Sequence, residues 1–349
     1  MTKKISIKDI AKELNISITT VSFVINGKSE EMGISQATAN RVNELITEWG
    51  FNPNSAARML RTGKSKTIGL IIEDIGNYFF GNIAKIIEVE ASKKGYNVFF
   101  SSTDNSDIRA KDLIKKMKNS SVDGMIITPT KGLVEDIKLL EKQNVPFVLL
   151  DRLIPDIEAN HVILNNYKGA YDLTKHLIKN GYKQIGFISI FSDLSQMDER
   201  EKGFMDALDK AGKTIPEEAI LKVRFDQSGT EIVLAIEKYL KKNPQLDALF
   251  FATNYLGVYG LEALQNANKK IPKDIAVVSF DDNDLFRLYT PSITVAAQPI
   301  HDIAVEAINL LLNIIHDRDK KNKPEGIVLD PQLIERNSSP KKKTMLLVE

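Results

Sequence analysis

Charged and amide side chains directly follow several apolar runs in the second part of this 349-residue chain. Asp151, Asn254 and Asp281 each come after such a run, and Arg200 opens an amphipathic segment after another. When strands alternate with helices, ligands bind at the carboxyl ends of the strands. These positions therefore predict a polar binding site, in which carboxylates accept hydrogen bonds while guanidinium and amide groups donate them.

A second candidate group follows the first apolar run, Thr67–Ile72, where the sequence turns from polar Asp74 to the aromatic residues Tyr78, Phe79 and Phe80. We expect Asp74 and Phe79 at the same site, with an aromatic ring offering a face to carbon atoms of a ligand. The structural alternatives are a helix cap for Asp74 and core packing for the aromatic rings.

The sequence argues against an enzyme. It has no cysteine, so thiolate metal sites and cysteine nucleophiles are excluded, and no Gly-x-Ser-x-Gly elbow is present. Gly63-Lys-Ser65 resembles part of a phosphate-binding loop, but Arg58 stands where that loop needs glycine. The histidines are scattered without metal-ligand spacing: His161, His176, His301 and His316. We therefore expect no catalytic residue, no metal and no cofactor.

The elements that must position these side chains alternate from Thr67 onward. Short apolar runs alternate with segments of helical periodicity, which predicts parallel, doubly wound sheets. The rhythm occurs twice, over residues 67–160 and 162–290, and two later strand-like runs, 292–297 and 326–329, could cross back between the lobes. The predicted helices include 81–94, 168–180, 200–211 and 256–267.

The N-terminal segment has the pattern of two short helices joined by a tight turn. Ser6 and Ser17 are predicted caps, and in the second helix Val21 and Val24 point towards the first. The opposite face of the second helix carries residues at spacings i, i+1, i+4 and i+5: Ile18, Thr19, Ser22 and Phe23. Such an exposed, partly apolar face needs a partner, as in a helix-turn-helix that enters the DNA major groove; a third packed helix is the alternative.

A third helix is predicted from Ser35 to Gly50, followed by a short helical piece, Ser55–Arg61, that is too short to be stable alone. Residues 1–66 hold 10 Lys and Arg against 6 Asp and Glu, whereas the rest holds 37 against 40. A basic head on a mildly acidic body is typical of a protein that contacts phosphates with one end.

These patterns resemble the LacI/GalR family of bacterial repressors. The resemblance rests on Ile7-Lys-Asp-Ile-Ala-Lys-Glu-Leu14, Ile16-Ser-x-Thr-Thr-Val-Ser22, Val24-Ile-Asn-Gly27, Gly50-Phe-Asn-Pro-Asn54 and Ala56-Ala-Arg-x-Leu60. It implies a homodimer that binds double-stranded operator DNA, with Leu60 of each subunit wedged into the minor groove. The DNA-contacting residues so predicted are Ser6, Ser17, Ile18, Thr19, Thr20, Ser22, Phe23, Asn26, Asn54, Ala57 and Leu60.

Phe23 departs from the family pattern, which often has arginine at this position. Arginine reads guanine through two hydrogen bonds, and phenylalanine has no such donors. We expect a preference for thymine-containing steps at this contact.

Residues 67–339 resemble the periplasmic-binding-protein-like effector domain of the same family. The resemblance implies that Arg200 and Asn254 hold sugar hydroxyls, with Asp281 and Asp151 at further contacts. Two departures concern the ligand: Tyr255 follows Asn254 where aspartate is common, and His301-Asp302 replaces a frequent Met-Gly pair. Arg152 could instead hold an acidic or phosphorylated ligand, so a sugar, a sugar acid or a sugar phosphate remains open.

The expected fold is an all-α helix-turn-helix head plus an α/β body of two doubly wound parallel-sheet lobes. The expected divisions are a DNA-binding domain (1–50), a hinge helix and linker (51–66), an effector-binding and dimerisation domain (67–339) and a disordered tail (340–349). The predicted function is a cytoplasmic transcription repressor of carbohydrate-utilisation genes under a sugar-like effector, with no membrane partner, since no apolar run approaches the length of a span. The alternatives are a sugar-binding module without specific DNA binding and a repressor that needs a purine-type corepressor.

Overall fold

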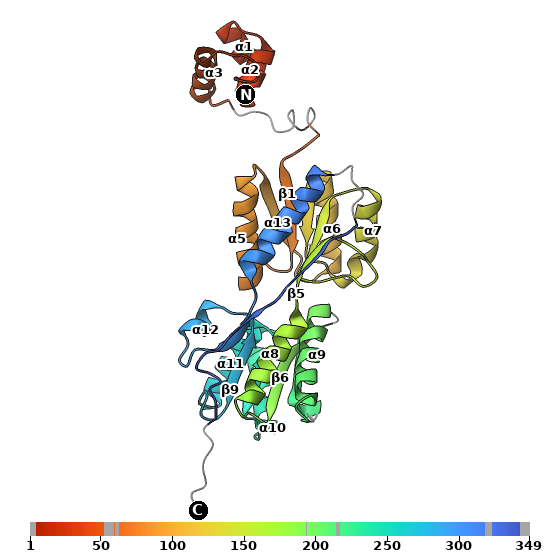
Figure 1. Ribbon diagram of the computed structural model, residues 1–349, viewed down its shortest axis with the longest axis vertical. Coiled ribbons are helices and arrows are strands. Elements are labelled where there is room, and N and C mark those ends of the chain that lie inside the picture. Colours follow the sequence, from red (N-terminus) through yellow and green to blue (C-terminus); the bar gives the residue numbers. More distant parts are fainter. Residues whose placement is uncertain are drawn as a thin grey trace, which may run out of the picture. The chain divides into compact units, whose positions relative to one another are not determined.

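The computed structural model of the chain describes residues 5–51, 59, 63–192, 194–213, 217–317 and 323–342 (Figure 1). The chain divides into two compact units, Met1–Ser65 and Lys66–Glu349. The division falls inside the segment that the sequence assigns to a hinge and linker.

The first unit is helical. Its described helices are α1 (Ile7–Leu14), α2 (Ile18–Ile25) and α3 (Gln36–Glu48). Ile10, Val21 and Val42, one from each helix, are completely buried and form the centre of its core. The three helices are therefore held by one small apolar cluster, which agrees with the stripes read from the sequence.

The second unit contains two lobes, each built on a parallel sheet (Figure 1). In the N-lobe the described strands lie in the order β11-β5-β4-β3-β1-β2, and all neighbours are parallel. The strands are β1 (Thr67–Ile72), β2 (Asn97–Ser102), β3 (Gly124–Ile127), β4 (Phe147–Leu150), β5 (His161–Leu164) and β11 (Gly326–Leu329). Its helices are α5 (Tyr78–Lys93), α6 (Asp107–Asn119), α7 (Val134–Lys142), α13 (Ile300–His316) and the short 3-10 helix η1 (Lys131–Leu133).

The C-lobe repeats this arrangement in the order β12-β10-β9-β8-β6-β7, with only the β10–β12 pair antiparallel. Its strands are β6 (Ile185–Phe191), β7 (Ile220–Arg224), β8 (Ala248–Phe251), β9 (Ala276–Phe280), β10 (Thr294–Ala297) and β12 (Gln332–Ile334). Its helices are α8 (Asn166–Lys179), α9 (Ser195–Asp209), α10 (Gly229–Lys242), α11 (Asn254–Asn266), α12 (Asp284–Leu288) and the 3-10 helix η2 (Glu217–Ala219). The predicted fold class is confirmed.

Helices cover both faces of each sheet, which explains why the central strands β1, β3, β4, β8 and β9 are buried, largely apolar runs. In β1, Leu70 and Ile72 pack towards α5 and α13, whereas Ile71 packs towards α6 and α7. In β8, Phe250 packs towards α8 and α9, whereas Phe251 packs towards α10 and α11. The alternation follows the period of two along a strand.

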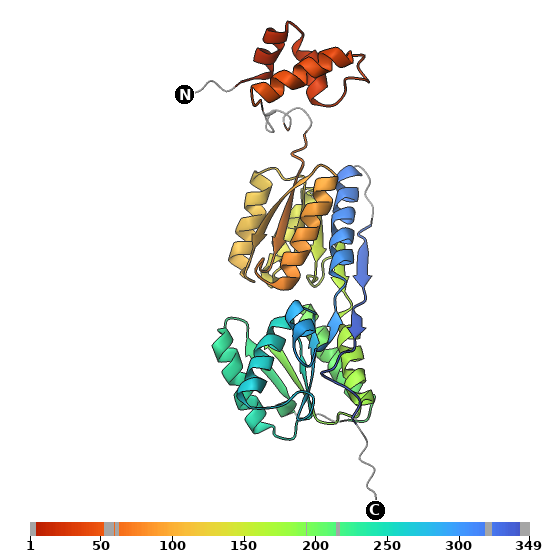
Figure 2. The same ribbon diagram turned by 90° about the vertical axis from the view of Figure 1, so that its left-hand side faces the viewer.

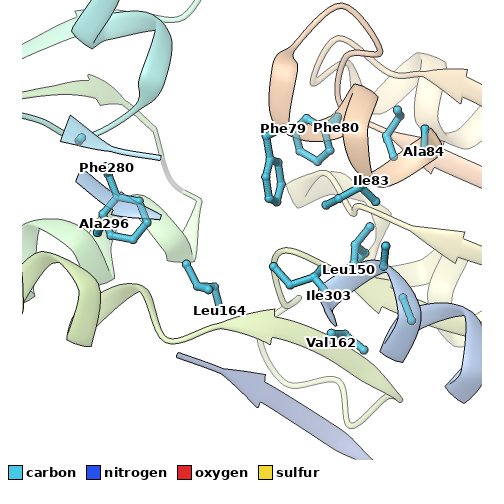
Figure 3. Packing of buried hydrophobic residues seen from close by; sticks show 14 of the residues in the cluster. Phe79, Phe80, Ile83, Ala84, Leu150, Val162, Leu164, Phe280, Ala296 and Ile303 are labelled. Carbon is cyan, nitrogen blue, oxygen red and sulfur yellow. The ribbon is translucent and has the colours of Figure 1, made fainter. Parts of the chain in front are cut away.

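One of these clusters contains residues of both lobes (Figure 3). Phe79, Phe80 and Leu150 lie on its N-lobe side and Phe280 on its C-lobe side, with Leu164 between them at the end of β5. Apolar packing on this side of the two sheets therefore extends to the segment that leads from one lobe into the other.

The chain passes between the lobes at Asn165, at Gln298–Pro299 and at Asp330–Pro331 (Figure 2). The prediction that residues 326–329 cross back is confirmed, because β11 joins the N-lobe sheet. The similar expectation for residues 292–297 is wrong: β10 stays beside β9 in the C-lobe. The helix expected from Gly81 starts at Tyr78 because Asn77 caps it, accepting from Phe79 N at 2.9 Å.

The predicted tail begins at residue 340, but its first residues are hydrogen bonded to the C-lobe. Tyr182 donates to the carbonyl of Pro340 at 2.8 Å, Lys342 N donates to Asn180 O at 2.9 Å, and Lys342 Nζ lies 2.7 Å from Asp247. The body therefore extends at least to Lys342, and residues 343–349 lie outside the described part of the chain.

Candidate functional site

Side-chain caps define where α1 and α2 begin in the head. Ser6 accepts from Asp9 N while the Asp9 carboxylate accepts from Ser6 N, and Ser17 accepts from Thr20 N at 2.9 Å. Asn15, between the helices, has a left-handed backbone with φ 51°, which asparagine tolerates. Ser6 and Ser17 thus set where the helices begin.

The outer face of α2 is open as predicted. Ile18 is 48% exposed and Thr19 is exposed, while Ser22 and Phe23 are half-buried and lie outside the head's core cluster. Thr20 is half-buried beside its cap, and Asn26 is exposed and donates from Nδ2 to Ser22 O. The remaining predicted DNA contacts, Asn54, Ala57 and Leu60, lie outside the described residues.

A polar cavity lies between the two lobes of the second unit. Its lining consists of strand ends and helix starts from both lobes: Glu73, Asn77, Phe79, Phe80, Asp151, Arg152, Ile190, Leu194, Gln196, Met197, Arg200, Phe225, Thr253, Asn254, Tyr255, Asp281 and Gln298. This is the carboxyl edge of both sheets, where the topology predicts a ligand.

Asp151 and Asp281 occupy equivalent positions in the two lobes. Asp151 follows β4 and Asp281 follows β9, and these strands have the same place in their sheets. Both have a left-handed backbone, with φ 72° and 66°. The amide of Asp151 donates to Val162 O at 3.0 Å and that of Asp281 to Ala296 O at 2.9 Å. The chain therefore leaves both strands through the same kink and places both carboxyl groups at the cavity.

Arg152 is fully engaged within the N-lobe. Nε donates to Asp151 at 3.2 Å, Nη1 donates to Asn105 at 2.9 Å, and Nη2 forms an ion pair with Glu73. The side chain is only 3% exposed. Burial by itself would lower the pKa of Arg152, but Asp151 and Glu73 outweigh it and raise the pKa.

Arg200 is the corresponding cation of the C-lobe. Nε donates to Asn166 at 2.9 Å, Nη1 donates to Ala252 O at 2.6 Å, and the guanidinium lies 3.7 Å from the centre of the Phe280 ring. Asp281 is 3.8 Å from Nη1. Burial lowers the pKa of Arg200 and its two neighbouring carboxylates offset only part of this effect.

Asp151 itself is only 8% exposed. Burial raises its pKa, and the attraction of Arg152 and Arg200 compensates only in part. The cavity thus combines buried charges of both signs, an arrangement that can hold a polar molecule through charge-assisted hydrogen bonds.

The structure brings Phe79, Asp151, Arg200, Asn254 and Asp281 to this cavity. It does not bring Asp74 there: this side chain is exposed and accepts from Gly76 N at 2.8 Å, which closes its own turn. Glu73, the residue before Asp74, does line the cavity.

Sequence reasoning missed Glu73, Gln196 and Gln298 as cavity residues. Gln298 Nε2 donates to Asp281 at 2.6 Å from the second crossing segment. The sequence feature that could have identified Gln298 is its position directly after strand β10. Tyr78 lies outside this lining and contributes to a neighbouring hollow with Asp284 and Arg287.

In the described part of the chain, no cluster of histidine and carboxylate side chains could hold a metal ion. Among the same residues, no helix is both long and apolar enough to span a membrane.

Comparison with known proteins agrees with the two-unit architecture. The profile for bacterial regulatory proteins of the lacI family matches residues 6–54, and that for the periplasmic binding protein-like domain matches residues 174–339. The HTH-type transcriptional regulator RegA of Clostridium saccharobutylicum is 32% identical over 336 residues, which cover 96% of this chain and 99% of RegA.

Two solved structures span nearly the whole chain. The complex of the transcriptional regulator CelR with cellobiose has a TM-score of 0.70 at 25% identity and covers 96% of this chain and 99% of CelR. The Lac repressor dimer bound to operator and an anti-inducer has a TM-score of 0.84 at 22% identity, covering 97% and 100% of the two chains. At 22% identity, the match to the Lac repressor shows similarity of fold alone.

A helix-turn-helix unit joined to a two-lobed α/β unit with a polar interlobe cavity defines a class of DNA-binding regulators. The extent and identity of the match to RegA place the chain within one family of that class. The chain belongs to the lacI family of bacterial regulatory proteins and is a DNA-binding transcriptional regulator. RegA and CelR are both named as transcriptional regulators.

Proposed function

We propose that this regulator is a homodimeric, cytoplasmic repressor of carbohydrate-utilisation genes that a small sugar-like effector releases from its operator. The observation that carries the proposal is the buried set of Asp151, Arg200 and Asp281, which meets between the lobes with the charge and hydrogen-bonding capacity that a polyol needs. CelR, a relative in fold at 25% identity, is a regulator that binds cellobiose.

The DNA side of the proposal rests on α2. Ile18 and Thr19 are exposed on a helix held firmly by the core of the head, so its outer face is available for base edges. Two such heads in a two-fold dimer would read a pseudo-palindromic operator. Asn54, Ala57 and Leu60, which belong to the predicted hinge and linker segment, would contact the DNA as well.

The effector side rests on hydrogen bonds that connect the cavity to the crossing segments. Arg200 donates to Asn166, just past the first crossing, and Asp281 accepts from Gln298 at the second. A ligand that engages Arg200 and Asp281 would therefore bias the angle between the lobes. It changes DNA affinity only if it binds the two arrangements with different affinity.

The test is a thermal-shift screen of the full chain against sugars, sugar acids, sugar phosphates and purines. A ligand at about 100 times its dissociation constant should stabilise the body by about 2.7 kcal/mol. We expect a sugar to be the hit, and expect Arg200→Ala and Asn254→Ala to reduce its thermal shift while Arg224→Ala, on an exposed side chain, does not. A purine hit that tightens DNA binding would replace this proposal by a corepressor mechanism.

A further inference from the structure

The charges and free hydrogen-bonding atoms of the cavity also bear on the chemical class of the effector. We infer that the effector has no negative charge and presents several O–H or N–H donors, so that it is a neutral or amino sugar and not a sugar acid or sugar phosphate. This inference rests on the effector function proposed above.

Carboxylates outnumber guanidinium groups at the cavity. Its charged lining residues are Glu73, Asp151 and Asp281 against Arg152 and Arg200. All five side chains are at most 12% exposed, so solvent screens them little. A ligand therefore enters a buried environment with a formal charge of −1.

Arg152 has little capacity left for an anion. Its Nε, Nη1 and Nη2 atoms already donate to Asp151, Asn105 and Glu73. Recruiting it to a phosphate or carboxylate would break a buried ion pair and leave Glu73 unpaired, which is strongly unfavourable. The side chain that the sequence suggested as an anion holder therefore belongs to the N-lobe network.

Arg200 offers only one free nitrogen. Nε and Nη1 donate to Asn166 and to Ala252 O, and the guanidinium stacks on Phe280. Among the described residues, no hydrogen bond is formed by Nη2. Arg–carboxylate and Arg–phosphate recognition is strong when two parallel donors face the anion, and the side-on pair of donors that includes Nε is unavailable here because Nε donates to Asn166.

Two amide side chains of the cavity present buried acceptors that lack a partner. Gln298 donates from Nε2 to Asp281, which fixes the orientation of the amide, and its Oε1 is buried without a partner. The Oε1 atom of Gln196, on the wall contributed by α9, is also buried without a partner. Buried acceptors are costly unless a donor reaches them, and hydroxyl or ammonium groups would supply those donors.

An anionic ligand would bring further acceptor oxygens and a like charge to these groups. At a separation of about 4 Å and an effective dielectric constant of about 20, one such repulsion lowers affinity by about three orders of magnitude. Partial compensation by Arg200 Nη2 reduces this factor, so we expect a loss of at least about 100-fold.

The experiment is calorimetric titration of the full chain with matched ligands that differ only in charge. One series is D-glucose, D-glucosamine, D-gluconate and glucose 6-phosphate, and a second uses the galactose counterparts. A thermal-shift screen of other sugars identifies any further sugar that binds, and its charged derivatives are then titrated in the same way. We expect a neutral or amino member to bind and its anionic counterpart to bind at least 100-fold more weakly.

Two variants test the cause. Glu73→Gln and, independently, Asp151→Asn remove one buried negative charge, and either should narrow the gap between neutral and anionic ligands at least tenfold. Glu88→Gln is the matched control, because it makes the same change at an exposed position of α5 and should leave the gap unchanged.

An anionic sugar that binds as tightly as its neutral counterpart would overturn the inference and leave the sugar-responsive function standing. An unchanged gap in both charge-removing variants would overturn it as well. If no sugar of any charge binds while the chain still binds DNA specifically, the proposed effector function fails and this inference fails with it.

Discussion

Replacing Arg200 by alanine should both destabilise the body and weaken effector binding. In the intact protein this side chain is 3% exposed and forms hydrogen bonds to Asn166 at 2.9 Å and to Ala252 O at 2.6 Å, with Asp281 3.8 Å away. The alanine variant leaves the amide oxygen of Asn166 and the carbonyl of Ala252 without this donor, and removes the positive charge beside Asp281. It also removes the group that stacks on Phe280.

The magnitude follows from these contacts. Removing one partner from a buried charge pair costs about 3 to 5 kcal/mol. In a domain of this size each kcal/mol shifts the melting temperature by roughly 2 to 4 °C, so Arg200→Ala should lower that of the body by about 6 to 20 °C. Loss of one charge-assisted hydrogen bond to the ligand should weaken effector binding about 10- to 100-fold.

Differential scanning calorimetry at pH 7 measures the first effect and isothermal titration the second. Arg224→Ala is the control, since that side chain is 70% exposed and forms a surface ion pair with Asp226. It should change the melting temperature by less than about 2 °C. Equal shifts in the two variants would refute the description of Arg200 as a satisfied, buried cation.

Four further predictions concern separate parts of the molecule. Phe23→Arg should introduce a guanine preference at one operator position in a selection from random duplexes, where we expect the native chain to prefer thymine. His176→Gln should reduce the decrease in the free energy of unfolding between pH 7 and pH 5. Burial lowers the pKa of His176 in the folded chain, so the unfolded chain takes up a proton first and the native protein loses stability as the pH falls. Gly203→Ala should destabilise the body by about 1 to 3 kcal/mol in a denaturant titration, because the added Cβ would lie 2.3 Å from the backbone oxygen of Tyr167. Asp74→Ala should leave effector affinity within about twofold, because the exposed Asp74 side chain does not line the cavity and its charge is screened by solvent.

The controls for these predictions lie close by in the sequence. Lys202→Ala, on the exposed side of the same helix as Gly203, should leave the denaturation midpoint nearly unchanged. Lys175→Gln, on the exposed side of the helix that carries His176, should keep the native pH slope. A variant of Phe23 that reads the same sites as the native head would contradict the assignment of this residue to a base contact.

The strand ends were readable from the sequence because local rules determine them. A parallel strand buried on both faces is a continuous apolar run, and the polar residue that ends it stands at the ligand edge of the sheet. Asp151 and Asp281 follow this rule in both lobes. The caps Ser6 and Ser17 were also predictable, since each cap depends on residues within three positions.

The pairings within the cavity could not be read in the same way. Arg152 meets Asn105 and Glu73 across 47 and 79 residues, and the sequence contains no signal for such long-range partners. The sequence predicted Asp74 as a cavity residue, but its neighbour Glu73 lines the cavity instead. Neighbouring residues at a strand end point to opposite faces, so an error of one residue selects the wrong side chain. The start of α9 was placed at Arg200, five residues late, because Leu194 precedes the helix without a side-chain cap.

The central claim is that one chain couples a ligand cavity to DNA release. It is tested most directly by fluorescence anisotropy of the full chain on a duplex selected for binding, titrated over salt and with the sugar found by thermal shift. The account predicts a steep salt dependence and an operator affinity that falls at least tenfold with the sugar, an effect that Arg200→Ala shifts to about 10- to 100-fold higher sugar concentration. An operator affinity that stays constant while the sugar saturates the cavity would contradict it.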